Sequence, residues 1–294
     1  MSNPRTHLIS LALLFLSLNA ISQTDTITVA NVTDSTGIVE DSPRHSLFSG
    51  LGYGSNMIYL GSTISQDQPY GFAALTYGFK DELYVTASAI HLYERSPFLA
   101  FYNLSLNYSH VINTWFDYSL GIYRYQVAPS LADTLFSNFT YSDASLGVDW
   151  RLLYTRLSFG GILVKDGGSY LQIKNSRYFE TPEFIGKKAY VSFDPYVNLL
   201  FGTLITTETT DGTSTTTSGP GRPWGSGTGT GSGSTSYTRH FGLMEADLGL
   251  PVALNSDRFT LEAEASYVFP VYTDTDYPGV KGFVFLLSFY FRIF

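Results

Sequence analysis

The chain of 294 residues contains no cysteine. This absence excludes disulfide bonds, cysteine-ligated metal sites, thiol catalysis and a lipid anchor on an acylated cysteine. Charged residues are also scarce, at 14% against 44% hydrophobic residues, so a water-facing surface would lack the usual proportion of charge. The net charge of -8 argues against a nucleic acid as a partner.

Long apolar runs and helical periodicity are missing as well. Outside the N-terminus, no window approaches the roughly 18 consecutive apolar residues of a transmembrane helix. Aromatic residues make up 16% of the chain and there are 27 Gly, a composition typical of strands and turns. A membrane protein without spanning helices must be a closed barrel, which pairs every backbone N–H and C=O group.

The last segment, 282–294, has a strand pattern of period two. One face carries only apolar residues, namely Phe283, Phe285, Leu287, Phe289, Phe291 and Ile293. The other face is mixed, with Val284, Ser288, Tyr290 and Arg292. Such a strand suits a sheet that has lipid on one side. Phe294 falls one residue out of phase with the aromatic face, which predicts a terminal bulge or a frayed end.

This ending resembles that of bacterial outer-membrane β-barrel proteins, which typically close with a C-terminal aromatic strand. The resemblance covers about residues 46–294, and the Ser22/Gln23 boundary with the Arg-Ile-Phe ending is similar to proteins of the Bacteroidetes type. It implies an outer-membrane location, with the lipid bilayer and lipopolysaccharide as surroundings. It also implies that the barrel-insertion machinery reads the C-terminal strand. No functional residue can be carried over, because the resemblance rests on pattern and terminus.

Three segments define the expected domain organisation. Residues 1–22 have the features of a secretory signal peptide, with Arg5 before an apolar stretch and a small residue at Ser22. Residues 23–45 lack amphipathic spacing and are interpreted as a flexible periplasmic tail. Residues 46–294 form the predicted barrel, and the Thr/Ser/Gly-rich tract at 206–237 is expected to be one long extracellular loop.

Alternating segments separated by turn signals predict an up-and-down barrel of about 12 strands, with 10 or 14 as alternatives. Short connectors at 80–82, 111–114, 151–152 and 252–257 fall on one side, and long ones at 61–69, 128–139, 206–237 and 272–280 fall on the other. Outer-membrane barrels have short periplasmic turns and long extracellular loops. Pro195 interrupts the expected strand 188–205, which predicts a bulge there.

Aromatic residues beside the short connectors are expected to form the inner girdle at the membrane interface. They are Phe79, Tyr84, Trp115, Trp150, Tyr154 and Phe259.

The main candidate site is a group of carboxylates in the lumen. Glu245 and Asp247 share one face of a predicted strand, Glu262 and Glu264 share one face of the next, and the opposite faces are apolar. If the registers align, all four side chains point into the barrel. Such a group could favour cations in a pore or hold a hard cation such as Ca²⁺.

The alternative is that basic residues neutralise these acids and brace a narrow barrel. The candidates in the lumen phase are Arg151, Arg156, Lys174, Lys188, Arg239 and Arg292. The same interpretation covers Asp117, Asp143, Asp149 and Asp194. No metal or other cofactor is required by either interpretation.

No enzyme signature is recognisable. None of His45, His91, His110 and His240 has a serine two residues later, as some barrel lipases do. The sequence therefore favours a non-enzymatic channel or transporter for ions or small solutes. The alternative is a structural or interaction barrel, either in an outer-membrane complex or as a surface-binding protein.

Overall fold

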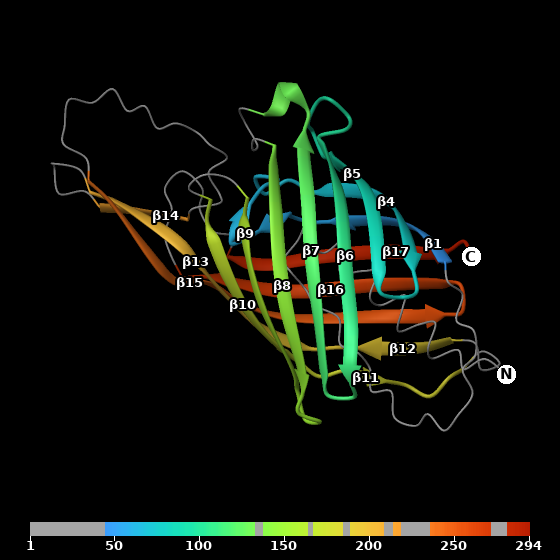
Figure 1. Cartoon of the computed structure of the whole chain (residues 1–294). Helices are drawn as coiled ribbons and strands as arrows, with labels where there is room; N and C mark the ends of the chain where they lie inside the picture. The colour runs from blue at the N-terminus through green and yellow to red at the C-terminus, as the bar shows by residue number, and fades with distance from the viewer. Residues whose placement is uncertain are drawn as a thin grey trace.

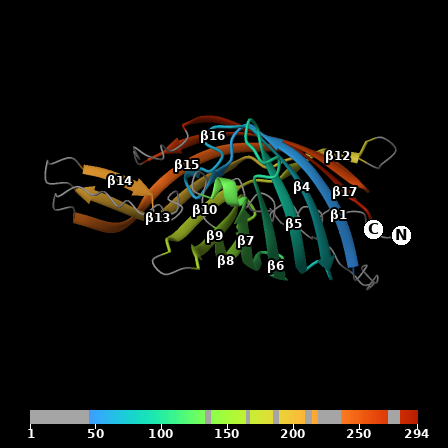
Figure 2. The ribbon, with the colours of Figure 1, turned by 90° about the horizontal axis from the view of Figure 1, so that it is seen from above.

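The computed structural model describes residues 45–132, 138–163, 167–184, 189–208, 214–218, 236–271 and 281–294. They form a closed, all-antiparallel barrel of 12 strands with essentially no helix, as Figures 1 and 2 show from the side and from above. The predicted fold and strand number are confirmed. The signal peptide expected at 1–22 and nearly all of the expected tail at 23–45 lie outside the described residues, as do 133–137 of the connector 128–139 and the whole connector 272–280.

The barrel wall consists of β1 (His45–Gly54), β4 (Tyr70–Phe79), β5 (Leu83–Leu92), β6 (Phe101–Asn113), β7 (Phe116–Val127), β8 (Phe139–Asp149), β9 (Tyr154–Ile162), β10 (Ser169–Ser176), β13 (Tyr196–Glu208), β15 (Ser236–Ser256), β16 (Phe259–Pro270) and β17 (Gly282–Arg292). The shorter elements are β2 (Ile58–Tyr59), β3 (Ser62–Thr63), the 3-10 helix η1 (Pro129–Leu131), β11 (Phe179–Glu180), β12 (Ala189–Phe193) and β14 (Ser214–Ser218). No helix of the described residues is long and apolar enough to cross a membrane.

The C-terminal strand is the seam of the cylinder. β17 pairs with β16 on one side, with Leu261 opposite Phe289, and with β1 on the other, with Leu51 opposite Phe289. The pairing of β13 with β15 completes the ring. This arrangement confirms the pairing expected from the aromatic ending, and it leaves no free edge in the barrel wall.

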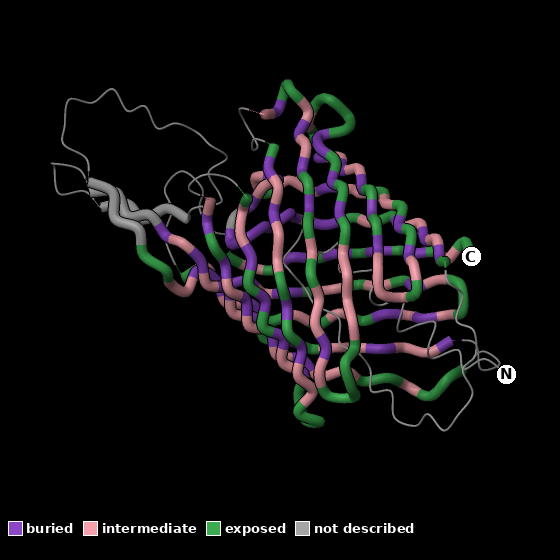
Figure 3. The backbone as a smooth tube through the Cα atoms, in the orientation of Figure 1, coloured by how far each residue is buried: buried purple, intermediate pink, exposed green. Residues whose placement is uncertain are grey.

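Burial alternates along the wall strands, as the bands of colour in Figure 3 show. In β17 the odd-numbered residues Phe283 to Phe291 are exposed, whereas Val284, Leu286, Ser288 and Tyr290 are buried. Successive side chains of a strand point to opposite faces, so one set faces lipid and the other faces the lumen. The exposed set is apolar in every central part of the wall, which a bilayer requires and water would not.

Tyrosine rings in the lumen lie over glycines of neighbouring strands. Tyr196 covers Gly249, its partner across the β13–β15 ladder, and a Cβ at Gly249 would be only 2.1 Å from the Tyr196 Cζ atom. Tyr170 covers Gly202 and Tyr84 covers Gly78 in the same way. The glycines of the lumen phase therefore leave room for the aromatic rings that fill the barrel.

The short connectors on the periplasmic side are tight turns. Lys80 and Asp81 both have φ of 56°, and the Glu82 N–H donates to the Phe79 carbonyl over 3.2 Å. Positive φ at both central residues matches the twist of the flanking strands. The β8–β9 turn likewise uses Arg151 at φ 70°, whose N–H donates to the Asp149 carboxylate over 2.6 Å.

Pro195 separates two strands instead of causing a bulge. β12 pairs with Val252 to Ser256 of β15, and β13 pairs with the earlier part of the same strand, so β12 and β13 run in line. Because proline has no N–H, the ladder is interrupted there. The bulge lies elsewhere, opposite Leu200 and Phe201, where Met244 is the extra residue and both Met244 and Glu245 are buried.

The tract at 206–237 is not simply a loop. β13 continues to Glu208, β15 begins at Ser236, and β14 adds a third strand along β13. These strands extend beyond the barrel wall at the upper left of Figure 1. The expectation of one long loop is therefore wrong for these segments, whereas 209–213 and 219–235 lie outside the described residues. Thr has high β propensity, which composition-based assignment of the tract to a loop overlooked.

The chain end lies outside β17, and only part of the expected girdle is exposed. β17 ends at Arg292, and Phe294 instead accepts a hydrogen bond from the Leu47 N–H through its carbonyl over 3.1 Å. The end is thus outside the strand and need not keep its phase. Trp115 and Trp150 are exposed beside the periplasmic turns, as a girdle requires, but Tyr84 and Tyr154 are buried in the lumen phase.

Candidate functional site

The lumen is divided into two halves of different chemistry. Toward the extracellular end, the buried side chains form one apolar and aromatic cluster that includes Tyr70, Leu92, Phe101, Tyr125, Tyr141, Tyr170 and Met244. Toward the periplasmic end, many of the buried side chains are polar or charged, including Thr76, Thr86, Ser105, Asp117, Ser145, Arg156, Lys174 and Ser288, although Phe48 and Tyr84 are buried there as well. The buried Glu245 lies opposite Leu200 of the apolar cluster.

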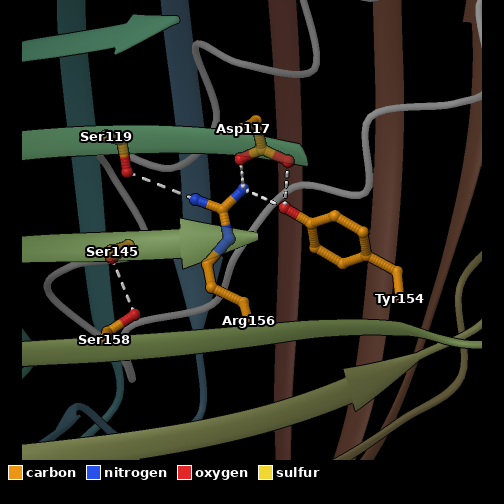
Figure 4. A network of polar contacts seen from close by, with 6 residues as sticks. All are labelled: Asp117, Ser119, Ser145, Tyr154, Arg156 and Ser158. Carbon is orange, nitrogen blue, oxygen red and sulfur yellow. Dashed lines mark hydrogen bonds and ion pairs between the residues drawn. The ribbon is translucent and has the colours of Figure 1, made fainter. Parts of the chain in front are cut away.

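An ion pair in the polar half joins β7 to β9 across β8, as Figure 4 shows. The Arg156 Nη2 atom is 3.3 Å from Asp117 Oδ1 and donates to the Tyr154 hydroxyl over 2.7 Å, and that hydroxyl donates to Asp117 Oδ2 over 2.8 Å. Gly147 lies between Asp117 and Arg156 in the register. A Cβ at Gly147 would be 2.4 Å from Asp117 Oδ2, so the glycine makes the contact across β8 possible.

A second polar network joins β10, β13, β15 and β16. The Lys174 Nζ atom lies 3.7 Å from the centre of the Tyr196 ring, and the Tyr196 hydroxyl donates to Glu264 over 2.7 Å. The Asn198 side chain donates to Asp247 over 2.7 Å. Two of the four candidate carboxylates are therefore bound to neutral groups that brace the wall where the ring closes.

The four candidate carboxylates share the lumen phase but occupy two levels. Asp247 lies opposite Val268 of β16, whereas Glu264 lies opposite Pro251 of β15. Glu264 and Val268 are four positions apart on one strand, roughly 13 Å at the rise of a β-strand. Among the described residues no group of three or more His, Asp and Glu side chains is arranged to hold a metal ion. The Ca²⁺ alternative therefore has no support in this part of the chain.

The carboxylate pairs also differ in burial. Glu245 and Asp247 are nearly inaccessible to solvent, and Glu262 and Glu264 are partly exposed. Tyr290 of the neighbouring strand β17 lies near Glu262 in the lumen.

The basic candidates lie in different environments. Arg156 and Lys174 are buried in the lumen as expected, and Arg292 lies partly buried in the lumen phase at the periplasmic end of β17. Arg151 is an exposed turn residue, and its carbonyl accepts a hydrogen bond from Arg177. The expectation for Arg151 is wrong because the strand ends at Asp149. Lys188 and the side chain of Arg239 lie outside the described residues.

The segment 55–69, which we call the crossbar, crosses the apolar half of the lumen. It contains the β2–β3 hairpin, in which the turn residues Leu60 and Gly61 have φ of 49° and 81°. The Tyr59 ring lies 5.4 Å from that of Tyr125 on β7 and 6.0 Å from that of Tyr141 on β8, measured between centroids. Ile58 packs instead with Val268 of β16 and Val284 of β17. Because β17 and β8 are six steps apart in the ring of 12, the crossbar contacts opposite walls.

Side-chain hydrogen bonds give the crossbar its own structure. The Asn56 Oδ1 atom accepts from Thr63 over 2.7 Å and from Ser65 over 2.8 Å, and its Nδ2 donates to Asp67 over 2.6 Å. Burial raises the pKa of Tyr59 well above its usual value, so its hydroxyl stays neutral.

The sequence analysis missed the crossbar and assigned 61–69 to an extracellular loop. Its signal was the run Met57-Ile-Tyr-Leu60 between Asn56 and the polar segment that follows, because an apolar run has little reason to occur in a solvated loop.

The described histidines do not form a catalytic arrangement with serine and aspartate. His110 lies in the outward phase at the periplasmic end of β6, and its Nδ1 atom is 2.7 Å from Glu82 Oε1 in a half-exposed pair. His91 stacks on Phe98, with ring centroids 4.3 Å apart. Both positions suit the membrane interface.

Comparison with solved structures returns other β-barrels, all at low identity. A structure titled KdgM porin shares 8% identity over 83% of this chain and 98% of its own, with a TM-score of 0.45. LpxR from Salmonella typhimurium shares 8% over 83% and 99%, with a TM-score of 0.46, and the COG4313 outer membrane channel from Pseudomonas putida F1 shares 10% over 89% and 100%, with a TM-score of 0.41. No family model and no curated protein sequence matches the chain.

The closed barrel, its apolar outward face and its tryptophans at the periplasmic turns define the class of protein. The chain is a bacterial outer-membrane β-barrel protein, located in the outer membrane. No narrower subfamily is assigned.

Proposed function

We propose that this barrel conducts small cations across the outer membrane. The observation that carries the proposal is the excess of negative charge in the lumen. The lumen-phase carboxylates are Asp117, Asp143, Glu245, Asp247, Glu262 and Glu264, and they outnumber the described lumen cations Arg156, Lys174 and Arg292.

Ion pairing compensates part of the negative charge in the lumen. Asp117 is compensated by Arg156 at 3.3 Å, whereas Asp247 and Glu264 receive hydrogen bonds from the neutral Asn198 and Tyr196 side chains. Acidic side chains that line a pore favour cations over anions. The Lys174 ammonium lies near Tyr196, so it lowers the local excess of negative charge.

The test is the reversal potential of the refolded protein in a planar bilayer with a KCl gradient. A potential of the sign expected for K⁺ supports the proposal, and Glu262→Gln/Glu264→Gln should move it toward zero. The matched control is Glu180→Gln, because Glu180 is exposed on β11 outside the barrel wall. Anion preference, or no conductance in the parent and in all variants including those with an altered crossbar, contradicts the proposal.

A second candidate function is an interaction barrel in an outer-membrane complex. The observation that favours it is the extension of β13, β14 and β15 beyond the wall, where β14 is the last strand of the sheet. Unpaired backbone groups of an edge strand can pair with a strand of another chain. Stoichiometric co-purification of a partner, lost when β14 is deleted, would support this function.

A further inference from the structure

The crossbar lies where a conducting path would have to pass. Met57, Ile58, Tyr59 and Leu60 are all buried inside the extracellular half of the barrel. Side chains from both walls meet them, with Tyr125 and Phe139 on one side and Val268 and Val284 on the other. The contacts of Ile58 and Tyr59 with the two walls are therefore apolar and aromatic.

An apolar constriction excludes ions for a physical reason. An ion that enters it must lose water without gaining polar partners, and a narrow apolar passage also tends to empty of water. Carboxylates adjoin this level, since Asp247 lies opposite Val268 and Glu264 lies opposite Leu286, but the contacts that Ile58 and Tyr59 make with the wall are apolar and aromatic. In this conformation the apolar contacts of the crossbar with both walls therefore oppose the passage of ions.

The contacts of the crossbar differ between its ends and its middle. At the ends, hydrogen bonds join it to the barrel, from the Ser55 N–H to the Phe285 carbonyl over 2.9 Å and from Arg95 to Gln66 over 2.5 Å. In the middle, Ile58 and Tyr59 meet the wall through apolar and ring contacts.

Apart from the Tyr59 hydroxyl, which is buried beside Tyr125 of the wall, the polar side chains of the middle are bonded within the crossbar. Asn56 serves Thr63, Ser65 and Asp67, and the Met57 N–H donates to the Ser65 hydroxyl over 2.9 Å. The hairpin can therefore leave the wall as a preformed unit without stranding its own polar groups. A segment held by hydrogen bonds to both walls would leave polar groups without partners when it moved.

We propose that the crossbar is a hydrophobic gate, which closes the lumen in the conformation described and opens it by swinging about its two hydrogen-bonded ends. This inference rests on the proposed function, because a gate requires a conducting barrel. It adds the regulation of the same path, and it assigns the closing contacts to Ile58 and Tyr59.

The absence of cysteine from the chain makes a tether experiment clean. Ile58→Cys/Val268→Cys joins the hairpin to the wall, by a disulfide formed with a mild oxidant or by a short bis-methanethiosulfonate reagent, and a thiol reductant cleaves both. The matched control is Val268→Cys/Val284→Cys, because both residues belong to the same apolar cluster but lie on the paired strands β16 and β17. Tyr59→Ala tests the opposite direction. The different gel mobility of heated and unheated samples shows that each variant is folded.

The expected result is that the tethered hairpin variant is silent in planar bilayers and regains the conductance of the parent after reduction, whereas the control pair conducts in both states. Tyr59→Ala should raise the open probability by roughly tenfold or more, because it removes the ring contacts with Tyr125, Phe139 and Tyr141. Ile58→Cys alone should react with a water-soluble maleimide while the barrel remains folded.

Three results would overturn the gate, and they separate it from the proposed function. Unchanged conductance in a fully tethered barrel shows that the path does not pass the crossbar. A silent parent beside a conducting variant with 57–64 replaced by a short glycine linker shows a fixed plug, and the proposed conduction then stands. If Ile58→Cys never reacts in the folded barrel, the hairpin does not move. Silence of the parent and of every variant rejects the proposed function, and the gate with it.

Discussion

Arg156 and Asp117 show how a single residue of the lumen depends on its neighbours. Neither side chain could remain charged and buried alone, because each would lose its hydration without compensation. Their contact spans β8 only because Gly147 has no side chain between them. The Tyr154 hydroxyl adds a donor and an acceptor to the same pair.

At this scale we predict that Asp117→Ala lowers the free energy of unfolding by about 3–5 kcal/mol, because it leaves the Arg156 charge buried and uncompensated. Asp117→Ala/Arg156→Met should recover much of the loss. Urea unfolding of the protein in lipid vesicles, followed by tryptophan fluorescence, measures both changes.

The control is Glu82→Ala, which breaks the half-exposed pair with His110 and should cost no more than about 1 kcal/mol. Equal losses for the two single variants would show that burial does not set the strength of the Arg156 pair.

Individual strands are matched to each other by size as well as by register. Gly249 of β15 lies under the Tyr196 ring of β13. The Lys174 ammonium lies over the same ring, and the Tyr196 hydroxyl donates a hydrogen bond to Glu264. A glycine in this position weakens the strand by itself. The ring above it compensates, and the two strands that close the barrel depend on this fit.

For these elements we predict that Gly249→Ala displaces the Tyr196 ring and destabilises the barrel by about 1–3 kcal/mol, as overpacking does in other interiors. The matched control is Gly71→Ala, since a Cβ there would meet nothing closer than 3.7 Å. The midpoint of urea unfolding compares the two. A loss at Gly71 as large as that at Gly249 would argue for a general effect of glycine in strands.

The whole molecule is a cylinder with a membrane belt, many buried polar side chains toward the periplasmic end and an apolar and aromatic cluster toward the extracellular end. Its orientation follows from the turns, since Trp115 and Trp150 both stand beside short periplasmic connectors and are exposed to the surroundings. Tryptophan prefers the headgroup level of a bilayer, where its ring is apolar and its N–H is hydrated.

At the scale of the molecule we predict that these two tryptophans lie at one interface. In the Trp224→Phe variant they are the remaining tryptophans of the three in the chain. Spin-labelled lipids with the label near the headgroup should quench their fluorescence more than lipids labelled at the middle of the acyl chain. Stronger quenching by the mid-chain label would place the periplasmic turns inside the bilayer and contradict the assigned orientation.

Residue periodicity was sufficient to predict much of the wall. The aromatic phase of 282–294, the pairing of that strand with both its neighbours and the lumen phase of Arg156 and Lys174 all follow from a repeat of two. Arg151 could not be placed in the same way, because a phase has meaning only within a strand and Arg151 belongs to a turn. Tyr84 and Tyr154 were assigned to the girdle by their position along the chain, although their phase directs them into the lumen.

The sequence by itself determined that the chain is a barrel, which side of each strand meets lipid and which residues form its seam, because alternation along a strand is a local property. Only the tertiary structure decided what fills the cylinder. The distance between the carboxylate pairs depends on the stagger of β15 against β16, and the meeting of Tyr59 with Tyr125 depends on a hairpin turning inward across the ring. Contacts between residues distant in sequence are not specified by any local pattern, so the apolar cluster and the polar networks of the lumen emerge only when the barrel closes.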